Sequence, residues 1–514
     1  MNRLQSLVLS LGILSLALTP ALRAADKDVK ALAAKIDERI AAVWGPKFKP
    51  APLADDAEFF RRVHLDLAGR IPSVTEIRDF LDDEQPDKRR VWVDRILQAD
   101  PDDASYKEAY INHFANVWRA WLLAQTGQQA QVQQPALETW LRQRIKAKIG
   151  YDRLVRELLT QPGNQGVGPG QGSAAVFYQA NENKPENLAG STARLFLGVK
   201  LECAQCHDHP FDKWTRTQFW EYAGFFTDLT PQGKRGEIKL PGKALVIRAR
   251  FLDGKEPKWN DPTRTRPTLA DWMTVADNPF FARAIVNRMW SHFFGVPLVH
   301  QAEGTTDDTP AAHKELLDEL ARQLVAHKYD LKFLIRAITA SEAYQRSSAV
   351  THPSQKDARL LARMPLRGLS PEQLFDSLAE ATEYRDSASN PPGLFVGVQG
   401  ARNRFLAKFA AQDQKTDYET SILQALYLMN NEFIADRTSL EKNRTLATLA
   451  EQRTSTARKV ESLYLVVLSR KPRPEESERF GKYVEKGGPA GDPKKALADV
   501  FWVLLNSPEF ILNH

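Results

Sequence analysis

The sequence predicts a mainly α-helical, multi-helical protein of two domains, with a small β-hairpin near the domain junction. Through most of the chain, apolar residues return every three or four positions, as at Tyr110, Phe114 and Val117, which places them on one face of a helix. Residues 237–253 break this pattern, because short alternating runs there flank a Pro-Gly turn. A chain of 514 residues has room for roughly two to four domains.

The first 24 residues predict a secretory signal peptide. Arg3 precedes an apolar run from Leu7 to Leu18, and the small residues Ala21 and Ala24 follow it. Because this run is too short to span a bilayer comfortably, we expect cleavage near Ala24 and no transmembrane anchor afterwards. The mature protein is therefore expected to be periplasmic or secreted.

Amphipathic helices are expected along the rest of the chain. Ser370 is suited to cap a helix that starts at Pro371, because a serine oxygen accepts from the first turn and proline fits the first helical position. Pro474 starts another helix, with acidic residues in its first turn. The segments with the clearest helical period are 137–159, 281–294, 316–325, 331–344, 422–433, 460–468 and 496–505.

Two further stretches interrupt the helical pattern. Residues 162–172 are rich in glycine and predict a surface loop, not a phosphate-binding loop, because these glycines do not lead from a strand into a helix. Residues 256–267 are rich in Pro, Asp, Lys and Arg, which is typical of a linker. We therefore predict a first domain at 25–228, the hairpin and linker at 229–265, and a second domain at 266–514.

The charge of the chain excludes some partners. Its 70 basic and 64 acidic residues give a formal charge of +6, and loss of Arg3 and Arg23 with the signal peptide leaves 6 − 2 = +4. The basic residues are interspersed with acidic ones and form no long basic block or aromatic-basic stripe. Nucleic acid is therefore not expected as a partner.

The two cysteines of the chain stand three positions apart in the run CAQCHDH, residues 203–209. Two thiols on one turn can form thioethers with the two vinyl groups of a haem, and the adjoining imidazole can bind the iron as an axial ligand. An exported protein also reaches the compartment in which bacteria attach haem c. The spacing therefore predicts haem c at Cys203, Cys206 and His207.

Two other interpretations use the same residues. Cys203 and Cys206 can form a structural disulfide without any cofactor, as an oxidising periplasm favours. Alternatively, the two thiolates can hold zinc or iron together with His207 and His209, since thiolate and imidazole suit both metals. His209 keeps this option open, because a residue two positions after the axial histidine cannot easily reach the opposite face of a haem.

A bound haem would also need a sixth ligand, or an open position for a small molecule. The candidates are Met289, His292 and His300, which lie in a run that also holds Trp290 and several phenylalanines suited to an apolar pocket. The alternative for each candidate is an ordinary core or surface residue. We keep them as candidate sixth ligands.

Two charged clusters have simpler explanations. Arg61, Arg62, His64 and Asp66 could present a cationic site to an acidic ligand, but their spacing favours a helix paired to its neighbour by salt bridges. The second cluster could suggest a hydrolytic site, yet no nucleophile elbow or HExxH motif accompanies it. This second cluster consists of Asp307, Asp308 and His313.

Four ordered motifs resemble a known family. Two of them, FFRRVHLDLAGRIPSVTEIRDFLDD and STARLFLGVKLECAQCHDHPFDKWTRTQFWEYAGFF, precede the predicted linker. The other two, RPTLADWMTVADNPFFARAIVNRMWSHFFGVPLVH and FWVLLNSPEFILNH, follow it. In these motifs the chain resembles exported planctomycete proteins that combine a cytochrome-associated domain of the PSCyt type with a domain of the PSD type.

The resemblance implies a secreted, helix-rich protein that works with others in bacterial catabolism, and it implies no established reaction. It leaves open whether the protein is an enzyme. Relatives often carry a separate small cytochrome domain, which this chain lacks, so any haem is expected at Cys203 and Cys206. The expected partner is a periplasmic redox or catabolic protein, and the alternative function is a non-enzymatic binding or assembly module.

Overall fold

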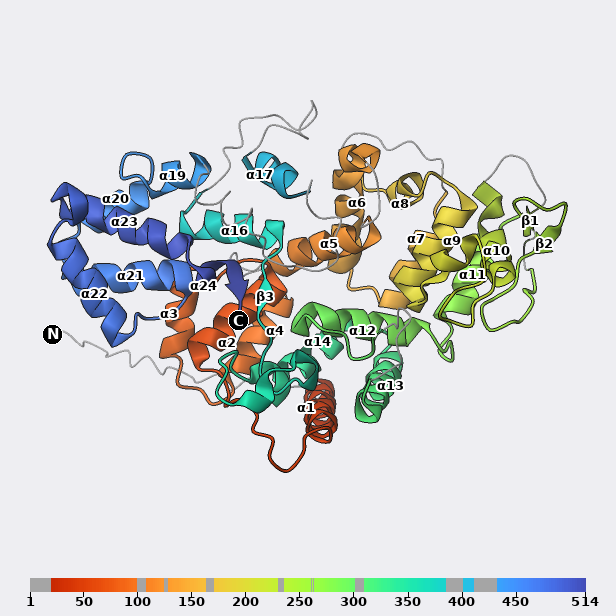
Figure 1. The fold of residues 1–514 in the computed structure, drawn as a ribbon, viewed down its shortest axis with the longest axis horizontal. Helices are drawn as coiled ribbons and strands as arrows, with labels where there is room; N and C mark the ends of the chain where they lie inside the picture. The colour runs from red at the N-terminus through yellow and green to blue at the C-terminus, as the bar shows by residue number, and fades with distance from the viewer. Residues whose placement is uncertain are drawn as a thin grey trace, which may run out of the picture.

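Helices build most of the described part of the protein, which confirms the predicted mainly α fold class (Figure 1). The computed structural model describes the positions 20–98, 108–123, 128–162, 171–229, 235–259, 261, 263–300, 309–384, 401–410 and 432–514. Within these positions the β structure comprises two small antiparallel two-stranded sheets. No helix in the same part of the chain is both long and apolar enough to cross a bilayer.

The helices before the predicted linker have the following bounds: α1 (Pro20–Ala41), α2 (Asp56–Ala68), α3 (Val74–Asp82), α4 (Lys88–Gln98), α5 (Ala109–Leu122), α6 (Gln128–Lys146), α7 (Tyr151–Thr160), α8 (Ala175–Ala180), α9 (Pro185–Thr192) and α10 (Arg216–Ala223). After the linker follow α11 (Thr265–Thr274), α12 (Phe281–Phe294), α13 (Ala311–Ala326), α14 (Leu331–Ala340), α15 (Glu342–Gln345), α16 (Pro371–Ala381), α17 (Ala401–Ala410), α19 (Glu432–Thr438), α20 (Arg444–Glu451), α21 (Thr456–Leu468), α22 (Pro474–Glu485), α23 (Pro493–Leu505) and α24 (Pro508–Ile511). The strands are β1 (Glu237–Lys239), β2 (Val246–Arg248), β3 (Arg367–Gly368) and β4 (Leu512–Asn513).

Local capping explains where several helices begin. The predicted cap at Ser370 is confirmed: its side chain accepts from the backbone N–H of Gln373, and the Gln373 side chain reaches back to the Ser370 N–H. Ser73 and Glu76 form the same reciprocal pair at the start of α3. These bonds satisfy N–H groups that the first helical turn leaves without partners.

Two predicted helices are each divided in the structure. The segment 137–159 forms α6 and α7 with a break between them, where Lys148 adopts a left-handed backbone with φ 53°. The segment 331–344 forms α14 and α15, because Ser341 leaves the helical conformation and caps α15 through the Tyr344 N–H. Helical period continues across both breaks, so periodicity alone did not predict them.

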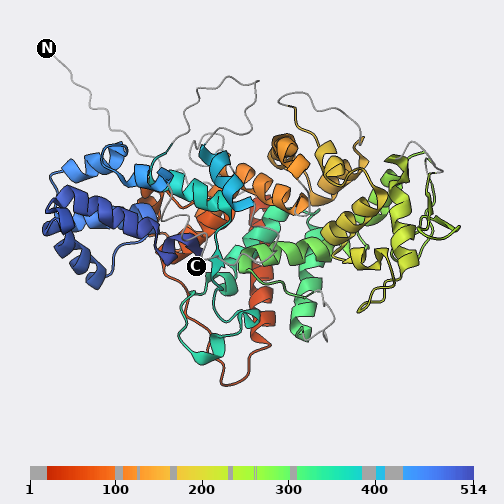
Figure 2. The ribbon, with the colours of Figure 1, turned by 45° about the horizontal axis from the view of Figure 1, so that its top comes forward.

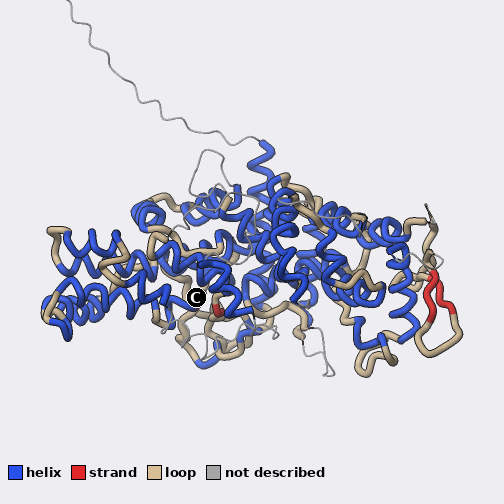
Figure 3. The backbone as a smooth tube through the Cα atoms, turned by 90° about the horizontal axis from the view of Figure 1, so that it is seen from above, coloured by secondary structure: helices blue, strands red, loops and turns tan. Residues whose placement is uncertain are grey.

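Some predictions lie outside the described residues. These are most of the signal peptide, most of the glycine-rich loop at 162–172, and nearly all of the helix predicted at 422–433. The predicted hairpin is described and confirmed: β1 pairs antiparallel with β2, with Ile238 opposite Ile247. It lies at one end of the elongated molecule, where its strands are drawn in red (Figure 3).

The hydrophobic side chains form two cores. The larger core takes residues from both sides of the predicted linker, so Leu154 and Phe219 pack in the same cluster as Met289 and Leu334. The smaller core joins α16 and the helices from α19 to α24. Several of these helices, drawn in blue, lie at the opposite end from the hairpin (Figure 2). Leu65 of α2 also belongs to it. Packing therefore ties α2 to the end of the chain and the two sides of the linker to each other.

Helix α2 is the point where distant segments meet. Asp66 is fully buried and accepts hydrogen bonds from Tyr344 Oη at 2.7 Å, Arg367 Nη2 at 2.9 Å and Asn513 Nδ2 at 2.7 Å.

The neighbouring Arg61 donates to the carbonyls of Val467 and Phe510, and Arg62 donates to that of His514. The charged cluster predicted on this helix therefore has a structural role. Main-chain carbonyls accept more of the hydrogen bonds from Arg61 and Arg62 than carboxylates do.

Candidate functional site

The cysteine motif lies on a short 3₁₀ helix, Leu201–Gln205, between α9 and α10. A π-helical turn, Ala193–Leu197, extends α9, and Gly198 then reverses the chain with φ 66°. Side chains three positions apart share one side of a 3₁₀ helix. Leu201 and Ala204 accordingly face the core, whereas Cys203 and Cys206 are both exposed free thiols.

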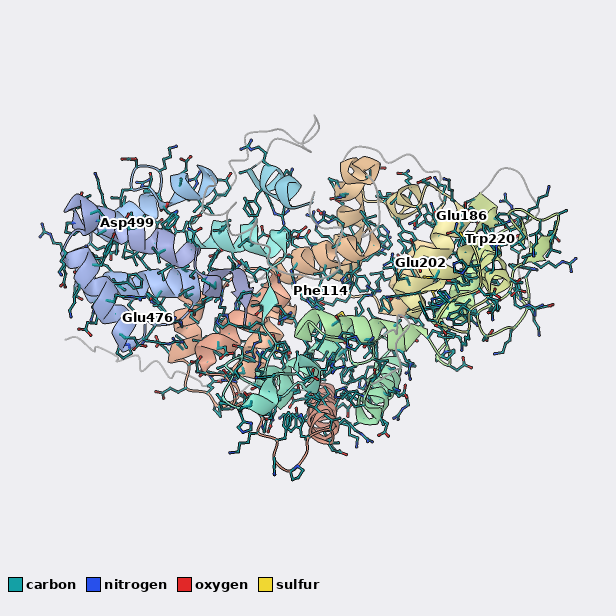
Figure 4. The ribbon with its side chains drawn as sticks, viewed as in Figure 1. Phe114, Glu186, Glu202, Trp220, Glu476 and Asp499 are labelled. Carbon is teal, nitrogen blue, oxygen red and sulfur yellow. The ribbon has the colours of Figure 1, made fainter. Side chains whose placement is uncertain are left out.

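Three polar contacts hold this helix in place, and a fourth links one of its partners to the hairpin. Glu202 pairs with Arg194 at 3.0 Å, and the carbonyl of Gln205 accepts from Trp220 Nε1 at 3.1 Å and from Arg216 Nε at 3.4 Å. Arg216 also donates through Nη2 to the carbonyl of Pro241 in the hairpin, at 2.7 Å. Figure 4 shows Glu202 and Trp220 close together at the hairpin end of the molecule. The backbone that carries the thiols is therefore braced from three neighbouring segments.

Helix α9 approaches the same segment closely. A Cβ on Gly190 would lie 2.6 Å from Cγ of Glu202, so only glycine allows the two segments to pack at this distance. The side chain of Glu202 is thereby held against α9, next to Cys203. This contact adds a steric restraint to the polar ones.

The imidazole of His207 has one nitrogen engaged and one available. Its Nδ1 lies 2.7 Å from the carbonyl oxygen of Asp208. A carbonyl only accepts, so Nδ1 must carry the proton, and Nε2 of a neutral ring then holds a free lone pair. No hydrogen bond to Nε2 is found among the described residues. His207 thus presents the nitrogen and tautomer that a metal ligand requires.

His209 has the opposite tautomer. Its Nδ1 lies 3.1 Å from the backbone nitrogen of Phe211, which only donates, so Nδ1 accepts and a neutral ring carries its proton on Nε2. Its own backbone N–H donates to the carbonyl of Trp214 at 2.8 Å. His209 therefore closes the turn that follows the cysteines, which accounts for a histidine that the haem interpretation left unexplained.

The turn after His209 is exposed and leads directly into α10. Phe211 is 68% exposed, whereas Trp214 is only 4% exposed and anchors the turn in the core. Asp208 accepts from the backbone N–H of Arg216, the first residue of α10, at 2.8 Å. The loop thus has fixed ends and an accessible face.

The four predicted metal ligands do not form a closed site in the structure. Among the described residues, no group of three or more His, Cys, Asp and Glu side chains has an arrangement that could hold a metal ion. Cys203, Cys206 and His207 are instead each exposed, and His209 is engaged in its own turn. Binding of zinc or iron would require the loop to rearrange.

The predicted sixth ligands make their contacts elsewhere. Met289 is fully buried in the larger core. The ring of His292 lies 5.7 Å from that of Phe114, which Figure 4 places near the centre of the molecule, away from Glu202. His300 is exposed. None of these contacts is with the cysteine motif.

The weaker hydrolytic cluster gains no support. Asp307 and Asp308 lie outside the described residues. His313 is buried, and burial lowers its pKa. Its Nε2 has no hydrogen-bond partner in the described part of the chain.

Sequence reasoning missed a group of buried polar residues between α5, α7 and α12. His113, Tyr151, Arg288 and His292 each have a buried polar atom without a hydrogen-bond partner among the described residues. Only His292 was singled out from the sequence. The signal that could have found the others is weak, because it consists of single polar residues within apolar helical faces.

The fold and the exposed loop define a helical protein with a CxxCH motif on a braced surface turn. Residues 35–230 match PSCyt2, a protein of unknown function (DUF1549), and residues 265–412 match PSD1, a protein of unknown function (DUF1553). The chain therefore carries these two domain families in tandem, which confirms the combination of a PSCyt-type and a PSD-type domain inferred from its motifs. No curated protein and no solved structure matches it.

Proposed function

We propose that the protein is an exported c-type haem protein that serves electron transfer or an oxidative step. In this proposal Cys203 and Cys206 hold the haem, and His207 binds the iron through Nε2. The observation that carries the proposal is the 2.7 Å contact between His207 Nδ1 and the Asp208 carbonyl, because it fixes the tautomer whose Nε2 can coordinate.

The thiols suit covalent attachment. Each thiol adds across one vinyl group, so a sulfur–carbon bond forms and the thiol proton ends on the neighbouring vinyl carbon. This addition needs no oxidant. It does need two reduced sulfurs on one side of the backbone, and Cys203 and Cys206 are both free and exposed. A bound haem would supply one-electron chemistry at its iron.

The surroundings suit exchange with a partner protein at the surface. Phe211 is 68% exposed on the loop, and Leu245 is 51% exposed on the adjoining hairpin segment. Arg216 connects the two segments through its bond to Pro241. Exposed apolar side chains of this kind are frequent at contact surfaces. A periplasmic redox or catabolic protein is the partner that fits this proposal.

The test is expression of the full chain with export and a haem-attachment system. The expected result is a Soret absorption band and a haem-stained band that survives a denaturing gel. Both signals should vanish in the Cys203→Ala/Cys206→Ala variant. Of the bonds between haem and protein, only the thioethers persist on a denaturing gel. Colourless wild-type protein from a system that matures a control cytochrome would contradict the proposal.

A matched variant at His209 separates the haem interpretation from a zinc or iron site. In His209→Asn, the asparagine Oδ1 can replace Nδ1 as the acceptor from Phe211, so the turn is expected to persist. Haem attachment should then be nearly unchanged, whereas a metal site that uses His209 would lose its ion. Metal analysis of both proteins measures the bound ion. A count of reactive thiols tests the remaining alternative, a binding or assembly module with a Cys203–Cys206 disulfide.

A further inference from the structure

Four polar atoms in the centre of the protein are buried without a hydrogen-bond partner among the described residues. They are Nε2 of His113 on α5, Oη of Tyr151 on α7, and Nε of Arg288 and Nε2 of His292 on α12. Buried polar atoms are rarely left unpaired, because losing their water without a replacement is costly. Four such atoms from three helices therefore need an explanation.

The four residues belong to one continuous cluster, joined by two tryptophans of α5. The guanidinium of Arg288 lies 5.5 Å from the ring centroid of Trp121, and the His292 ring lies 6.1 Å from the same ring. Trp118 continues the cluster, with its ring 4.9 Å from Trp121 and 5.4 Å from Tyr151.

His113 lies at the other end of the cluster, beyond His292. Its ring lies 5.8 Å from the His292 ring. We call this group the Arg288 cluster; it consists of His113, Trp118, Trp121, Tyr151, Arg288 and His292. Contacts between aromatic rings connect its four unpartnered polar atoms.

The charge of the cluster is uncompensated. Arg288 donates to the carbonyl of Arg194 at 3.2 Å and has no carboxylate partner in the described part of the chain. Two partly buried arginines do have one: Arg194 pairs with Glu202, and Arg367 pairs with Asp66. The fully buried Arg61 instead donates to several main-chain carbonyls. An unpaired charge in the interior is strongly unfavourable unless something supplies the counter-charge.

The protonation states leave one positive charge in the cluster. Burial lowers the pKa of Arg288 only to about 10, so it stays charged near pH 7. Burial also lowers the pKa of His113 to about 3 and that of His292 to about 4, so both rings are neutral. Burial raises the pKa of Tyr151, which keeps its hydroxyl protonated.

We propose that the Arg288 cluster is a binding site for a small organic monocarboxylate. The guanidinium of Arg288 pairs with the carboxylate, and the Tyr151 hydroxyl donates to it. The indole of Trp121 and the ring of His292 contact the apolar part of the ligand. Trp121, Arg288 and His292 are half-buried, so part of each side chain stays accessible.

The chemistry favours a carboxylate over water or phosphate. Water can satisfy the orphan hydrogen bonds, but it does not neutralise Arg288. Phosphate carries up to two charges at neutral pH, whereas the cluster offers one cation and the neutral hydroxyl of Tyr151. A planar carboxylate also matches the fork of an arginine side chain, and indole rings suit a flat apolar ligand body.

The test is calorimetric titration of the full-length protein with benzoate, and with benzamide and phosphate as comparison ligands. Benzoate is expected to bind saturably, with phosphate weaker and benzamide absent. Arg288→Gln should weaken benzoate at least about tenfold, because it removes a charge-assisted contact. Arg283→Gln is the matched control, since Arg283 lies on the same helix and pairs with Asp318 at the surface.

Tyr151→Phe guards against a folding defect in the arginine variant. It removes only the hydroxyl and keeps the ring stacked on Phe281 and Trp118, so the expected loss is about threefold to tenfold. The Cys203→Ala/Cys206→Ala variant should bind benzoate as the wild type does, which separates this inference from the haem proposal. Absence of saturable benzoate binding, tighter binding of phosphate, or equal binding by Arg288→Gln and the wild type would each overturn it.

Discussion

Asp66 on α2 and Arg288 on α12 are both charged side chains in the interior, and they differ in what surrounds them. Asp66 accepts from Tyr344, Arg367 and Asn513, which come from three other segments. Arg288 has one carbonyl acceptor and no carboxylate partner among the described residues. A fully paired buried charge is there to fix the fold, whereas an unpaired one is available to a ligand.

The largest expected effect is at the paired charge. Asp66→Ala leaves the Arg367 guanidinium buried without its counter-charge and removes the acceptor of two other donors. We expect the free energy of unfolding to fall by about 3–5 kcal/mol. Denaturant unfolding of the purified protein measures this loss. Asp66→Asn, which keeps the shape and some hydrogen bonds, should lose less, and a loss below about 1 kcal/mol for the alanine variant would contradict a structural role.

The next effect is a pH dependence that comes from His292. Its folded pKa of about 4 lies below the ordinary value of 6.5, so below pH 6.5 the unfolded chain binds a proton that the folded protein excludes. Stability from this residue is therefore complete above pH 6.5 and is lost as the pH falls to about 4. The expected loss is about 3 kcal/mol.

Unfolding free energies at about pH 7, 5.5 and 4 provide the check, because this range runs from above the unfolded pKa of the ring down to its folded pKa. His292→Gln removes the titrating group, so its stability should fall less steeply than that of the wild type over this range. Equal slopes for the two proteins would show that the ring is not excluded from protonation in the folded state.

A smaller loss of stability is expected when Asp66 loses the hydroxyl group that donates to it from Tyr344. Tyr344→Phe removes the 2.7 Å bond to Asp66 and leaves the ring in place, so stability should fall by about 1.5–3 kcal/mol. Tyr151→Phe is a suitable control, since Tyr151 is buried but its hydroxyl has no hydrogen-bond partner among the described residues. The prediction fails if both variants lose the same amount.

The smallest change in stability is expected at the unpaired charge. Arg288→Met replaces a buried cation without a carboxylate by an apolar side chain of similar length, so stability should change by less than about 1 kcal/mol or increase. Arg367→Met, which removes a paired arginine, should instead be destabilising by about 3 kcal/mol. Thermal and denaturant unfolding of both variants measure the contrast between the two regions directly.

Much of the fold was predictable because it depends on local signals. The helical period predicted α12 at its observed bounds, the Ser370 cap predicted the start of α16, and the alternating run predicted the β1–β2 hairpin. The breaks at Lys148 and Ser341 were missed, since the apolar period runs through both. The two cores were also not predicted, because packing across the predicted linker depends on contacts between residues far apart in the chain.

At the candidate site, the sequence predicted which residues to examine but not what each can do. The spacing of Cys203 and Cys206 already placed two thiols on one turn. The opposite tautomers of His207 and His209 follow only from their backbone partners, Asp208 and Phe211. That difference favours His207 as a ligand and assigns His209 to the turn.

The sequence by itself determined the helical fold class, the hairpin and the cysteine motif, because periodicity, turn residues and spacing act within a few positions of the chain. Only the tertiary structure decided which charges are paired. Asp66 meets Tyr344 and Asn513 across hundreds of positions, and Arg288 lies among helices that supply aromatic rings but no carboxylate in the described part of the chain. Such pairing depends on how helices pack in space, which no local pattern encodes.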